Sequence, residues 1–374
     1  MFWSRREEET FKPKEHKLKR KIEVEMREPQ IDTTRKLFEN KRILITGGAG
    51  SIGSRTIREL LKYNPKTIRV FDNDETRLFY LQNEFEKHKN LRFFSGDIRD
   101  KERLSYAIEN IDIVFHMAAL KHVTICEYNP FEAVKTNVIG IQNLIDVAMA
   151  EEVDKVIFTS SDKAVNPTNT MGVTKLLCEK LIVSANYYKG PRKTVFSSIR
   201  FGNVLGTSGS VIPLFKEQIK NGGPITITDP NMTRFVMSFN EAINLIFQCV
   251  EMAIGGEVFI LKMPALNIND LADVVINELA SKHDFKPNEI KKEIIGLKAG
   301  EKLYEELMTE EEVDRAFETE NMFIVLPQIK GTLQDYQEID YSIYKNLKKP
   351  KLKSYNSKNT KLLSKHEIKN LLFR

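Results

Sequence analysis

A glycine repeat directly after a short apolar run constrains the fold of this chain more than any other feature. In TGGAGSIG, residues 46–53, Gly47, Gly50 and Gly53 follow the apolar run Ile43–Thr46 and open a helix-period stretch. Glycine is needed at such a turn because a side chain would keep the backbone away from a pyrophosphate, whose charge favours the N–H groups at the helix start. We therefore expect a strand, a tight turn and a helix, the beginning of a βαβ unit.

Four further segments repeat the pattern of a buried strand that ends in a small or polar residue. They are KTIRVFDND, NLRFFSGD, DIVFHMAA and DKVIFTSS, and helical segments such as Asn129 to Ala150 separate them. A sixth strand is expected in SSIRFGNV, near Ser197 to Asn203. Strands that alternate with helices predict a parallel sheet covered on both faces. The predicted class is α/β, a Rossmann-type doubly wound parallel sheet with a smaller C-terminal α/β substrate lobe.

Turn-forming residues become more frequent after this sixth strand. Gly, Pro and Thr become denser in GTSGSVIP and NGGPITITDPNMTRF, which marks the second lobe. We expect four parts, namely a polar N-terminal extension (1–40), a dinucleotide-binding domain (41–204) with return segments near 239–262, a substrate lobe (205–340) and a basic C-terminal tail (341–374).

Composition excludes several classes of protein. A chain of 374 residues with 41% hydrophobic and 29% charged residues can bury two cores, and no window approaches the roughly 18 apolar residues that a bilayer span requires. The start, MFWSRREEETFKPKEHKLKRK, lacks the apolar stretch of an export signal, so a cytoplasmic location is expected. Cys126, Cys178 and Cys249 lie too far apart in sequence for a zinc motif or a disulfide framework, and no metal is expected.

Positive charge is concentrated at the C-terminus. Residues 345–374 hold ten Lys or Arg against one acid, Glu367, although the whole chain carries a formal charge of only +5. A basic tail can contact nucleic acid or an anionic membrane surface, but a solvated tail is the simpler interpretation. We expect no nucleic-acid partner and no transmembrane segment, and we leave peripheral membrane contact through the tail open.

Acidic residues follow the second and third predicted strands. Asp72 lies 19 residues past Gly53, where a carboxylate can accept hydrogen bonds from a ribose diol and repel a 2′-phosphate. This favours NAD over NADP, with Arg77 as the residue that could reverse the preference. Asp97 could hold the adenine amine, or it could cap a helix ahead of Lys101.

The segment HMAALKHV follows the fourth predicted strand. Its small residues Ala118 and Ala119 let a cofactor approach closely, and Lys121 and His122 then fall near the carboxyl ends of the strands, where ligands bind in open parallel sheets. A purely structural, hydrogen-bonded role for His122 stays open.

Eight motifs together resemble the extended short-chain dehydrogenase/reductase superfamily: TGGAGSIG, FDND, GDIRD, HMAALKHV, SSDKAVNPTNTMGVTK, RFGNVLGTSGSVIP, TRFVM and GEKLYEEL. Within it, they resemble the nucleotide-sugar 4,6-dehydratases that act on UDP-N-acetylglucosamine, the group related to capsule and flagellin-glycan enzymes of polysaccharide biosynthesis. The resemblance runs from about Lys41 to Leu307. It implies a nucleotide-sugar substrate, a homo-oligomer and bound NAD, whose expected contacts are Gly47, Gly50, Ser51, Ile52, Gly53, Asp72, Asn73, Asp97, Ile98, Ala118, Ala119, Lys121, Asn137 and Lys175.

One position departs from the superfamily pattern. Most members have a Tyr, three residues and then a Lys, and here these positions hold Met171 and Lys175. A branch of the dehydratases has the same replacement, so the departure narrows the assignment. The resemblance implies that Lys175 binds the nicotinamide ribose and that Met171 lines the sugar pocket, because residues four apart share one face of a helix.

The implied reaction removes water from the sugar in three linked steps. Hydride leaves C4 for the nicotinamide, a base removes the C5 proton as water departs from C6, and the hydride returns to C6. The resemblance gives Asp162 as the acid and Lys163 as the base, with Ser161 orienting one of them. For that role we expect burial to lower the pKa of Lys163.

The second lobe is expected to hold the nucleotide. Asn203 and Arg234 resemble the residues that contact the sugar diphosphate, and Ser210 and Val211 end a loop rich in N–H groups that suits phosphate oxygens. Lys121 and His122 complete the expected substrate contacts, and a surface ion pair is the alternative for Arg234. In GEKLYEEL, Glu301 and Lys302 are assigned to structure near the site, and Asn137 is expected to order backbone and water.

Two other functions are kept beside the dehydratase. A C4 epimerase would share the cofactor half, but epimerases normally keep the tyrosine and have no need of the acid and base in SDK. A non-catalytic NAD-binding protein would have no need of Asp162 and Lys163 either. The choice between UDP and GDP donors and the C5 configuration of the product are not readable from the sequence.

Overall fold

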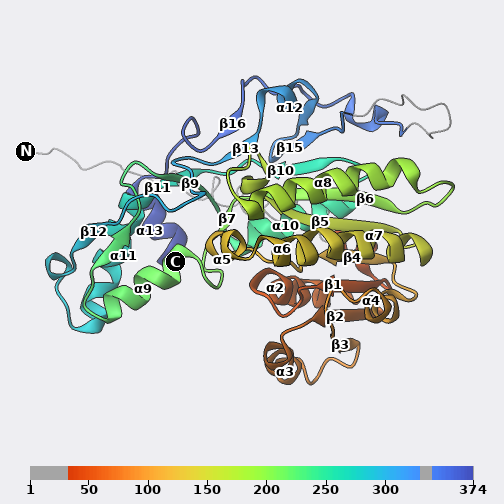
Figure 1. The fold of residues 1–374 in the computed structure, drawn as a ribbon, viewed down its shortest axis with the longest axis horizontal. Coiled ribbons are helices and arrows are strands. Elements are labelled where there is room, and N and C mark those ends of the chain that lie inside the picture. The colour runs from red at the N-terminus through yellow and green to blue at the C-terminus, as the bar shows by residue number, and fades with distance from the viewer. Residues whose placement is uncertain (1–32, 329–338, 374) are drawn as a thin grey trace, which may run out of the picture.

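A nine-stranded sheet forms the body of the molecule (Figure 1). The computed structural model describes residues 33–328 and 339–373. Its strands, in sheet order, are β14 (Ala316–Glu318), β15 (Met322–Val325), β10 (Val258–Leu261), β6 (Val195–Phe201), β5 (Lys155–Ser161), β4 (Ile113–His116), β1 (Arg42–Thr46), β2 (Thr67–Asp72) and β3 (Leu91–Ser95). From β3 to β10 all neighbours are parallel, and β15 and β14 pair antiparallel at the far edge. The predicted α/β class and the six predicted strands are confirmed.

Helices cover both faces of this sheet, as a doubly wound fold requires. Ile43 and Ile45 of β1 belong to one core, whereas Leu44 between them belongs to the other, because successive side chains of a strand point to opposite faces. The first core packs under α2 (Ser51–Leu60), α3 (Glu75–Glu84) and α10 (Phe239–Met252). The second packs under α4 (Lys101–Ile108), α7 (Gly140–Ala150) and α8 (Thr170–Tyr188), with α5 (Val123–Tyr128), α6 (Pro130–Ala133) and the π-helix η2 (Val134–Ile139) beside them.

A smaller lobe lies beyond the carboxyl ends of the parallel strands (Figure 1). It holds α9 (Val211–Lys220) and α11 (Ile268–Leu279), around a third core that includes Ile212, Phe215 and Leu271. Its short strands are β7 (Asn203–Val204), β8 (Ile225–Ile227), β9 (Thr233–Met237), β11 (Ala265–Asn267) and β12 (Lys292–Ile294). Short 3₁₀ turns are η1 (Leu61–Tyr63), η3 (Asp162–Ala164), η4 (Ala280–His283), η5 (Pro287–Glu289) and η6 (Ser342–Tyr344).

The chain returns to the main sheet twice after entering this lobe. Strand β10 lies inside the return segment expected near 239–262. Strands β14 and β15, which the sequence pattern did not predict, form a second return within the region expected to belong to the substrate lobe. The body of the sheet therefore draws on three separate stretches of the chain.

The C-terminal segment is folded, which corrects the expectation of a solvated basic tail. Strand β16 (Tyr355–Asn356) pairs with β13 (Glu306–Met308), which α12 (Glu310–Asp314) follows, and α13 (Lys365–Phe373) packs on α11. Tyr344, Ser357 and Ile368 are almost fully buried. Part of the positive charge is paired, because Lys365 Nζ lies 2.7 Å from a carboxylate oxygen of Asp273 on α11. Charge pairing and apolar burial together hold the segment against the lobe.

The N-terminal extension ends earlier than its predicted boundary at residue 40. Residues 33–38 are helical, and Phe38 is fully buried with its ring centroid 4.7 Å from that of Phe247 on α10. The rest of the expected extension, residues 1–32, lies outside the described residues. Within residues 33–328 and 339–373, no helix combines the length and the apolar character that crossing a membrane requires.

Candidate active site

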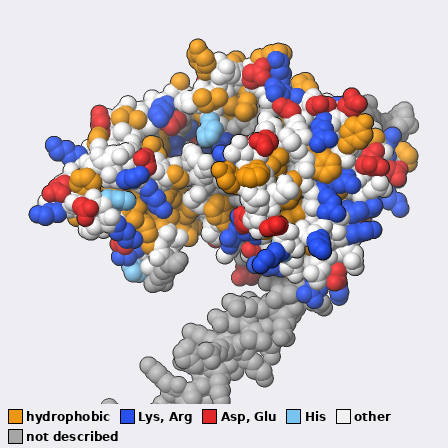
Figure 2. Space-filling model, turned by 90° about the horizontal axis from the view of Figure 1, so that it is seen from below, with side chains coloured by type: hydrophobic (Ala, Val, Ile, Leu, Met, Phe, Trp, Pro, Cys, Tyr) orange, Lys and Arg blue, Asp and Glu red, His pale blue; other side chains and the backbone are white. Residues whose placement is uncertain are grey.

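A cavity of about 610 Å³ opens at the carboxyl ends of the parallel strands, on the side of the smaller lobe. Figure 2 shows the surface hollowed between the two lobes. All residues predicted to bind cofactor or substrate, or to take part in catalysis, line this cavity except Asp162, Asn137, Val211 and Arg234. The strand order reverses direction between β1 and β4, so the cavity lies where doubly wound sheets bind their ligands.

The turn between β1 and α2 is shaped to receive a pyrophosphate. Gly47 has a φ of +66°, and a Cβ built on it would lie 2.6 Å from the backbone nitrogen of Ala118, so no other residue fits without movement. Gly50 caps α2 without a side-chain hydrogen bond, so no side chain occupies the N–H groups of its first turn. These groups carry the positive end of the helix dipole into the cavity.

Asp72 is held rigidly at the end of β2. One carboxylate oxygen accepts a hydrogen bond from the backbone of Ala49 at 2.9 Å, and the other accepts from the backbone of Asp74 at 3.0 Å. Each oxygen retains a lone pair for a ribose hydroxyl. Arg77, the residue that could favour a 2′-phosphate, lies with its Nε 3.1 Å from the Asp74 carboxylate. This geometry fits the ribose diol of NAD.

Asp97 lies beside this ribose site with its charge already paired. Its carboxylate accepts hydrogen bonds from Arg99, and the shortest is 2.6 Å from a guanidinium nitrogen. These hydrogen bonds lower the pKa of Asp97. The carboxylate therefore stays ionised at the edge of the cavity.

A second helix N-terminus faces the same cavity. Ser210 caps α9 without a side-chain hydrogen bond, and its buried hydroxyl has no partner among the described residues. Val211 begins the helix but does not line the cavity. The two helix starts therefore give the cavity two places suited to anions.

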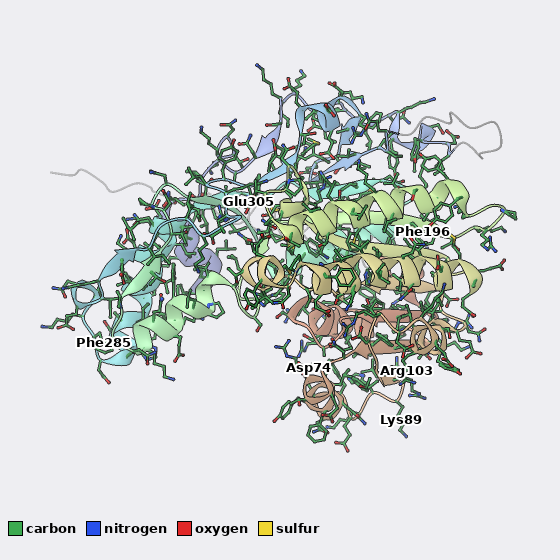
Figure 3. All side chains as sticks on the ribbon, viewed as in Figure 1. Asp74, Lys89, Arg103, Phe196, Phe285 and Glu305 are labelled. Atoms are coloured by element: carbon green, nitrogen blue, oxygen red, sulfur yellow. The ribbon has the colours of Figure 1, made fainter. Side chains whose placement is uncertain are left out.

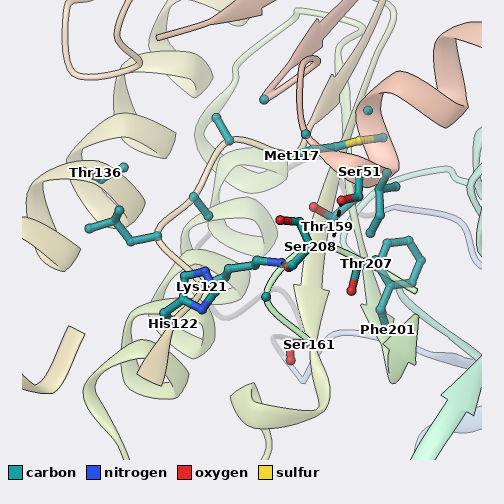
Figure 4. Close-up of a pocket in the computed structure, with 18 of the residues that line it drawn as sticks. Ser51, Met117, Lys121, His122, Thr136, Thr159, Ser161, Phe201, Thr207 and Ser208 are labelled. Atoms are coloured by element: carbon teal, nitrogen blue, oxygen red, sulfur yellow. Dashed lines mark hydrogen bonds between the residues drawn. The ribbon is translucent and has the colours of Figure 1, made fainter. Parts of the chain in front are cut away.

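The loop before α9 reaches across the cavity to the body of the sheet. Lys121 Nζ donates to the carbonyl of Ser208 at 2.7 Å, and the Ser208 backbone N–H donates to Ser51 Oγ at 3.1 Å (Figure 4). The ring of His122 lies against Gly209, where a Cβ would come within 2.5 Å of it. Lys121 and His122 therefore connect the loop to the cofactor side of the cavity.

Met171 and Lys175 both face the cavity from α8, as their spacing predicts. Lys175 Nζ donates to the carbonyl of Thr159 at 2.9 Å and lies 4.7 Å from the centroid of the Phe158 ring. Burial lowers the pKa of Lys175. None of the described residues that line the cavity is a tyrosine, so no phenol among them occupies the position that Met171 has taken.

Behind Lys175 lies a buried histidine that the sequence analysis did not single out. His116 Nδ1 is 2.7 Å from the hydroxyl of Thr46, and the ring stacks on Phe158. Burial, with a smaller effect of the Lys175 charge, lowers the pKa of His116 to about 3. The imidazole is therefore neutral and supports the ends of β1 and β4.

The Lys163 ammonium lies between two buried carboxylates. Its Nζ is 3.0 Å from Asp162 Oδ1 and 3.2 Å from Glu305 Oε1, and Asp162 Oδ1 also accepts from Ser161 Oγ at 2.7 Å. Burial acts to lower the pKa of Lys163, but the charges of Asp162 and Glu305 outweigh it and raise the pKa. This corrects the expectation of a lowered pKa, since the second carboxylate was not foreseen.

Asp162 is positioned behind the cavity wall rather than on it. Its side chain is 1% exposed, and its Oδ2 has no hydrogen-bond partner among the described residues. Ser161 and Lys163, which both contact Asp162, do line the cavity. A proton on Asp162 would therefore reach a ligand through these two neighbours.

Arg234 does not present the free guanidinium that a diphosphate contact requires. Its nitrogens donate to the carbonyls of Thr233 at 2.8 Å and Lys302 at 2.9 Å, and its Nε is 3.7 Å from Glu305. The geometry corresponds to neither expectation, because Arg234 is buried and connects β9 to residues 302–305.

Asn137 behaves as the sequence analysis expected, by ordering backbone. Its side chain bonds the N–H and the carbonyl of Leu120 at 2.8 and 3.1 Å, and it donates to Thr174 at 2.9 Å. It lies on the π-helix η2, a type of distortion that is frequent near functional sites. Asn137 thus fixes the loop that carries Lys121.

Glu305 is the site residue that sequence reasoning missed. The motif GEKLYEEL contains it, but the sequence-based prediction for this motif concerned Glu301 and Lys302. Lys302 Nζ donates to the carbonyl of Val165 at 2.8 Å and so attaches the segment to the loop after β5. Membership in this motif was the one sequence feature that could have indicated a role for Glu305. The residues around it in sequence do not show that it lies beside Lys163.

Comparisons with known proteins agree with this architecture. The sequence profile of a family described as "Polysaccharide biosynthesis protein" matches residues 43–327. A Methanocaldococcus jannaschii protein named as an uncharacterized membrane protein is 57% identical over 335 residues, 90% of this chain and 96% of that protein. A UDP-N-acetylglucosamine 4,6-dehydratase (inverting) of Campylobacter jejuni is 43% identical over 309 residues, 82% of this chain and 88% of that enzyme.

Two further similarities cover nearly the same region. A UDP-glucose 4-epimerase of Rickettsia typhi is 38% identical over 340 residues, 90% of this chain and 96% of that enzyme. The X-ray structure of Pen from Bacillus thuringiensis superposes with a TM-score of 0.82 at 48% identity, covering 90% of this chain and 98% of that one. The similarity therefore includes both lobes.

Proposed function

Because the chain belongs to the polysaccharide biosynthesis protein family, within the extended short-chain dehydrogenases/reductases, we propose that it is an NAD-dependent nucleotide-sugar 4,6-dehydratase. The proposed substrate is UDP-N-acetylglucosamine or a related nucleotide-activated N-acetylhexosamine. The product is its 4-keto-6-deoxy derivative, used in surface glycan biosynthesis. One observation carries the proposal: the Lys163 ammonium lines the cavity between two buried carboxylates, and no tyrosine lines it among the described residues.

The residues around the first helix start fit NAD. Gly47 leaves room for a pyrophosphate, Asp72 offers fixed lone pairs to a ribose, and Lys175 is positioned to bind the second ribose. Bound nicotinamide would supply hydride acceptance from C4 and hydride return to C6, so the reaction needs no external oxidant. The start of α9 and Asn203, on the opposite side, suit the sugar diphosphate.

The chain's own groups account for the two proton movements of the elimination. Lys163 first passes a proton to Asp162, which turns an ammonium and a carboxylate into a neutral amine and a carboxylic acid. The amine then takes the C5 proton, and the acid gives its proton through Ser161 to the departing C6 hydroxyl. Lys163 is then an ammonium and Asp162 a carboxylate. As hydride returns to C6, the Lys163 ammonium would give its proton to C5, and solvent, which takes up the proton that the C4 hydroxyl loses on oxidation, would restore the ammonium for another cycle.

A raised pKa of Lys163 suits this sequence of events. The pair must hold one shared proton before the sugar reacts, and the two carboxylates keep that proton on Lys163 at neutral pH. Activity should therefore fall at alkaline pH, as Lys163 loses the proton that Asp162 needs. No phenol takes part, and Met171 only shapes the sugar pocket.

A C4 epimerase is the second candidate, supported by the similarity to the Rickettsia typhi enzyme. Epimerisation at C4 requires neither an acid for the C6 hydroxyl nor a base for C5. It would leave the roles of Asp162 and Lys163 unexplained, which is why the dehydratase is preferred.

The deciding experiment is incubation with UDP-N-acetylglucosamine in deuterated water, followed by NMR. The dehydratase reaction predicts a 4-keto-6-deoxy product that carries solvent deuterium at C5. An epimerase would give the C4 epimer without deuterium at C5, and a binding protein would leave the substrate unchanged. Either result would refute the proposal.

Two alanine substitutions test the roles assigned to Lys163 and Met171. Lys163→Ala should reduce kcat by about 10²–10⁴-fold with NAD still bound, because it removes the base and the proton donor of Asp162. Met171→Ala should keep kcat within about tenfold of the wild type, since it removes only apolar contacts. NAD content is measured by absorbance after denaturation, and equal losses from both variants would contradict the assignment.

A further inference from the structure

Glu305 lies at the junction of the two lobes, whereas Phe285 marks the far end of the smaller one (Figure 3). We propose that Glu305 is a positioning residue for the elimination, which holds Lys163 in place while Asp162 changes charge, and that Ser357 of the C-terminal segment fixes Glu305 there. The inference rests on the proposed function and extends it to a part of the chain that the motifs did not assign to the site.

The side chain of Glu305 forms an ion pair with Lys163. Oε1 lies 3.2 Å from Lys163 Nζ and 3.7 Å from Arg234 Nε, and the side chain is 3% exposed. Oε2 is buried and has no hydrogen-bond partner among the described residues. Burying an ionised carboxylate destabilises the fold unless a nearby cation or hydrogen-bond donors compensate its charge. Among the described residues, the Lys163 ammonium lies closer to the Glu305 carboxylate than the Arg234 guanidinium does.

The backbone of Glu305 is fixed by a residue from the C-terminal segment. The Glu305 N–H donates to Ser357 Oγ at 3.0 Å, and the Ser357 N–H donates to the Glu305 carbonyl at 2.8 Å. The Ser357 hydroxyl also contacts Thr233 Oγ1 at 2.9 Å and the Thr233 carbonyl at 3.2 Å. Ser357 is fully buried. Ser357 therefore connects the backbone of Glu305 to strand β9 and so fixes the position from which the Glu305 side chain reaches Lys163.

The proposed reaction requires a constant anion beside Lys163. When Asp162 accepts the proton of Lys163, the attraction between these two groups is lost for that part of the cycle. Glu305 takes no part in this proton exchange, and its contact at 3.2 Å holds the amine near the C5 position. Without it, the lysine side chain could rotate away, and a displacement of about 1 Å can cost 10²-fold in rate.

Charged groups from three elements face Lys163 and set its proton affinity. Asp162 on η3 and Glu305 before β13 raise the pKa of Lys163, against burial, whereas Arg234 on β9 acts to lower it. Lys302 is a further cation near both carboxylates. Replacing Glu305 with an amide removes one of the two charges that raise the pKa. The alkaline limb of the kcat–pH profile should then move to lower pH.

Glu305→Gln tests the inference, with Glu310→Gln as the control. Glu310 is exposed at the start of α12, so its amide variant removes a carboxylate from the same segment without touching the site. With UDP-N-acetylglucosamine, Glu305→Gln should lower kcat about 10- to 100-fold, keep KM within about twofold and shift the alkaline limb to lower pH. Glu310→Gln should match the wild type in all three.

Ser357→Ala provides a second variant that retains the carboxylate. It removes the hydroxyl that accepts from Glu305 and contacts Thr233, and it should lower kcat by a smaller factor, with circular dichroism confirming the fold. A loss in Glu305→Gln without a shift of the alkaline limb would show a merely structural role and overturn the inference. Wild-type kcat in Ser357→Ala would overturn the part assigned to the C-terminal segment. Absence of wild-type turnover would instead refute the proposed function, and the inference with it.

Discussion

Replacing Arg200 with methionine should destabilise the fold far more than breaking a surface ion pair. The Arg200 guanidinium donates to both oxygens of Glu179 at 2.9 and 2.8 Å, to both oxygens of Glu312 at 2.7 and 2.8 Å and to the Leu307 carbonyl at 2.9 Å. The side chains are 3%, 4% and 12% exposed. Removing the cation leaves two buried carboxylates without their partner.

The expected cost follows from this burial. Breaking a buried ion pair by removing one partner typically costs about 3–5 kcal/mol, and here one residue serves two carboxylates. At about 1.4 kcal/mol per factor of ten, Arg200→Met should lower the ratio of folded to unfolded protein by at least about two orders of magnitude. Urea denaturation followed by circular dichroism measures the change.

Arg58→Met is the matched control. Arg58 also makes two hydrogen bonds to one carboxylate, at 2.7 Å each to Glu84, but these side chains are 36% and 44% exposed. Solvent screens such a pair, so its removal should cost less than about 1 kcal/mol. Equal effects of Arg200→Met and Arg58→Met would refute the reasoning from burial.

The same cluster predicts a pH dependence. Burial acts to raise the pKa of Glu312, but the charge and hydrogen bonds of Arg200 outweigh it and lower the pKa. The ionised carboxylate therefore contributes stability above the pKa of an unfolded glutamate, about 4.3, and this contribution is lost as the pH falls through the folded pKa. In Arg200→Met, Glu312 should contribute less to the stability that is lost as the pH falls.

A triple variant that also carries Glu179→Gln and Glu312→Gln should recover stability relative to Arg200→Met alone, because no buried charge is then left unpaired.

The remaining predictions concern the cofactor turn and the C-terminal segment. Gly47→Ala should weaken NAD binding at least about tenfold in isothermal titration, because its Cβ would lie 2.6 Å from the Ala118 nitrogen at a φ of +66°; unchanged affinity would contradict the close approach. Tyr344→Phe should cost about 1–2 kcal/mol in urea denaturation, because the buried hydroxyl contacts the Met252 carbonyl at 2.6 Å and Glu257 at 2.9 Å. A variant as stable as the wild type would mean that these contacts do not stabilise the fold.

Features encoded in short stretches were predictable from the sequence. The glycine turn at Gly47, the strand that ends in Asp72 and the spacing of Met171 and Lys175 each depend on neighbours within a few residues. The side-chain period of strands and helices and the glycines of the turn were therefore enough to predict that these residues line the cavity. The position of Lys163 directly after β5 followed in the same way, because parallel strands bring their carboxyl ends to one edge.

Errors arose where a residue's role depends on partners far away in the chain. Arg234 was expected to contact a diphosphate, but the carbonyl of Lys302, which is distant in the chain, accepts a hydrogen bond from its guanidinium. The C-terminal lysines suggested a solvated tail, because sequence patterns do not show that Asp273 of α11 lies opposite Lys365. Charge counts report the number of charges and not which of them meet.

The sequence by itself determined the α/β architecture, the dinucleotide turn and the lysine at the edge of the sheet, because each is set by local backbone geometry and the side-chain period. Only the tertiary structure decided that Glu305, held by Ser357, would lie beside Lys163 and raise its pKa. The physical reason is that the proton affinity of a buried group depends on every charge within a few ångströms, whatever its distance along the chain.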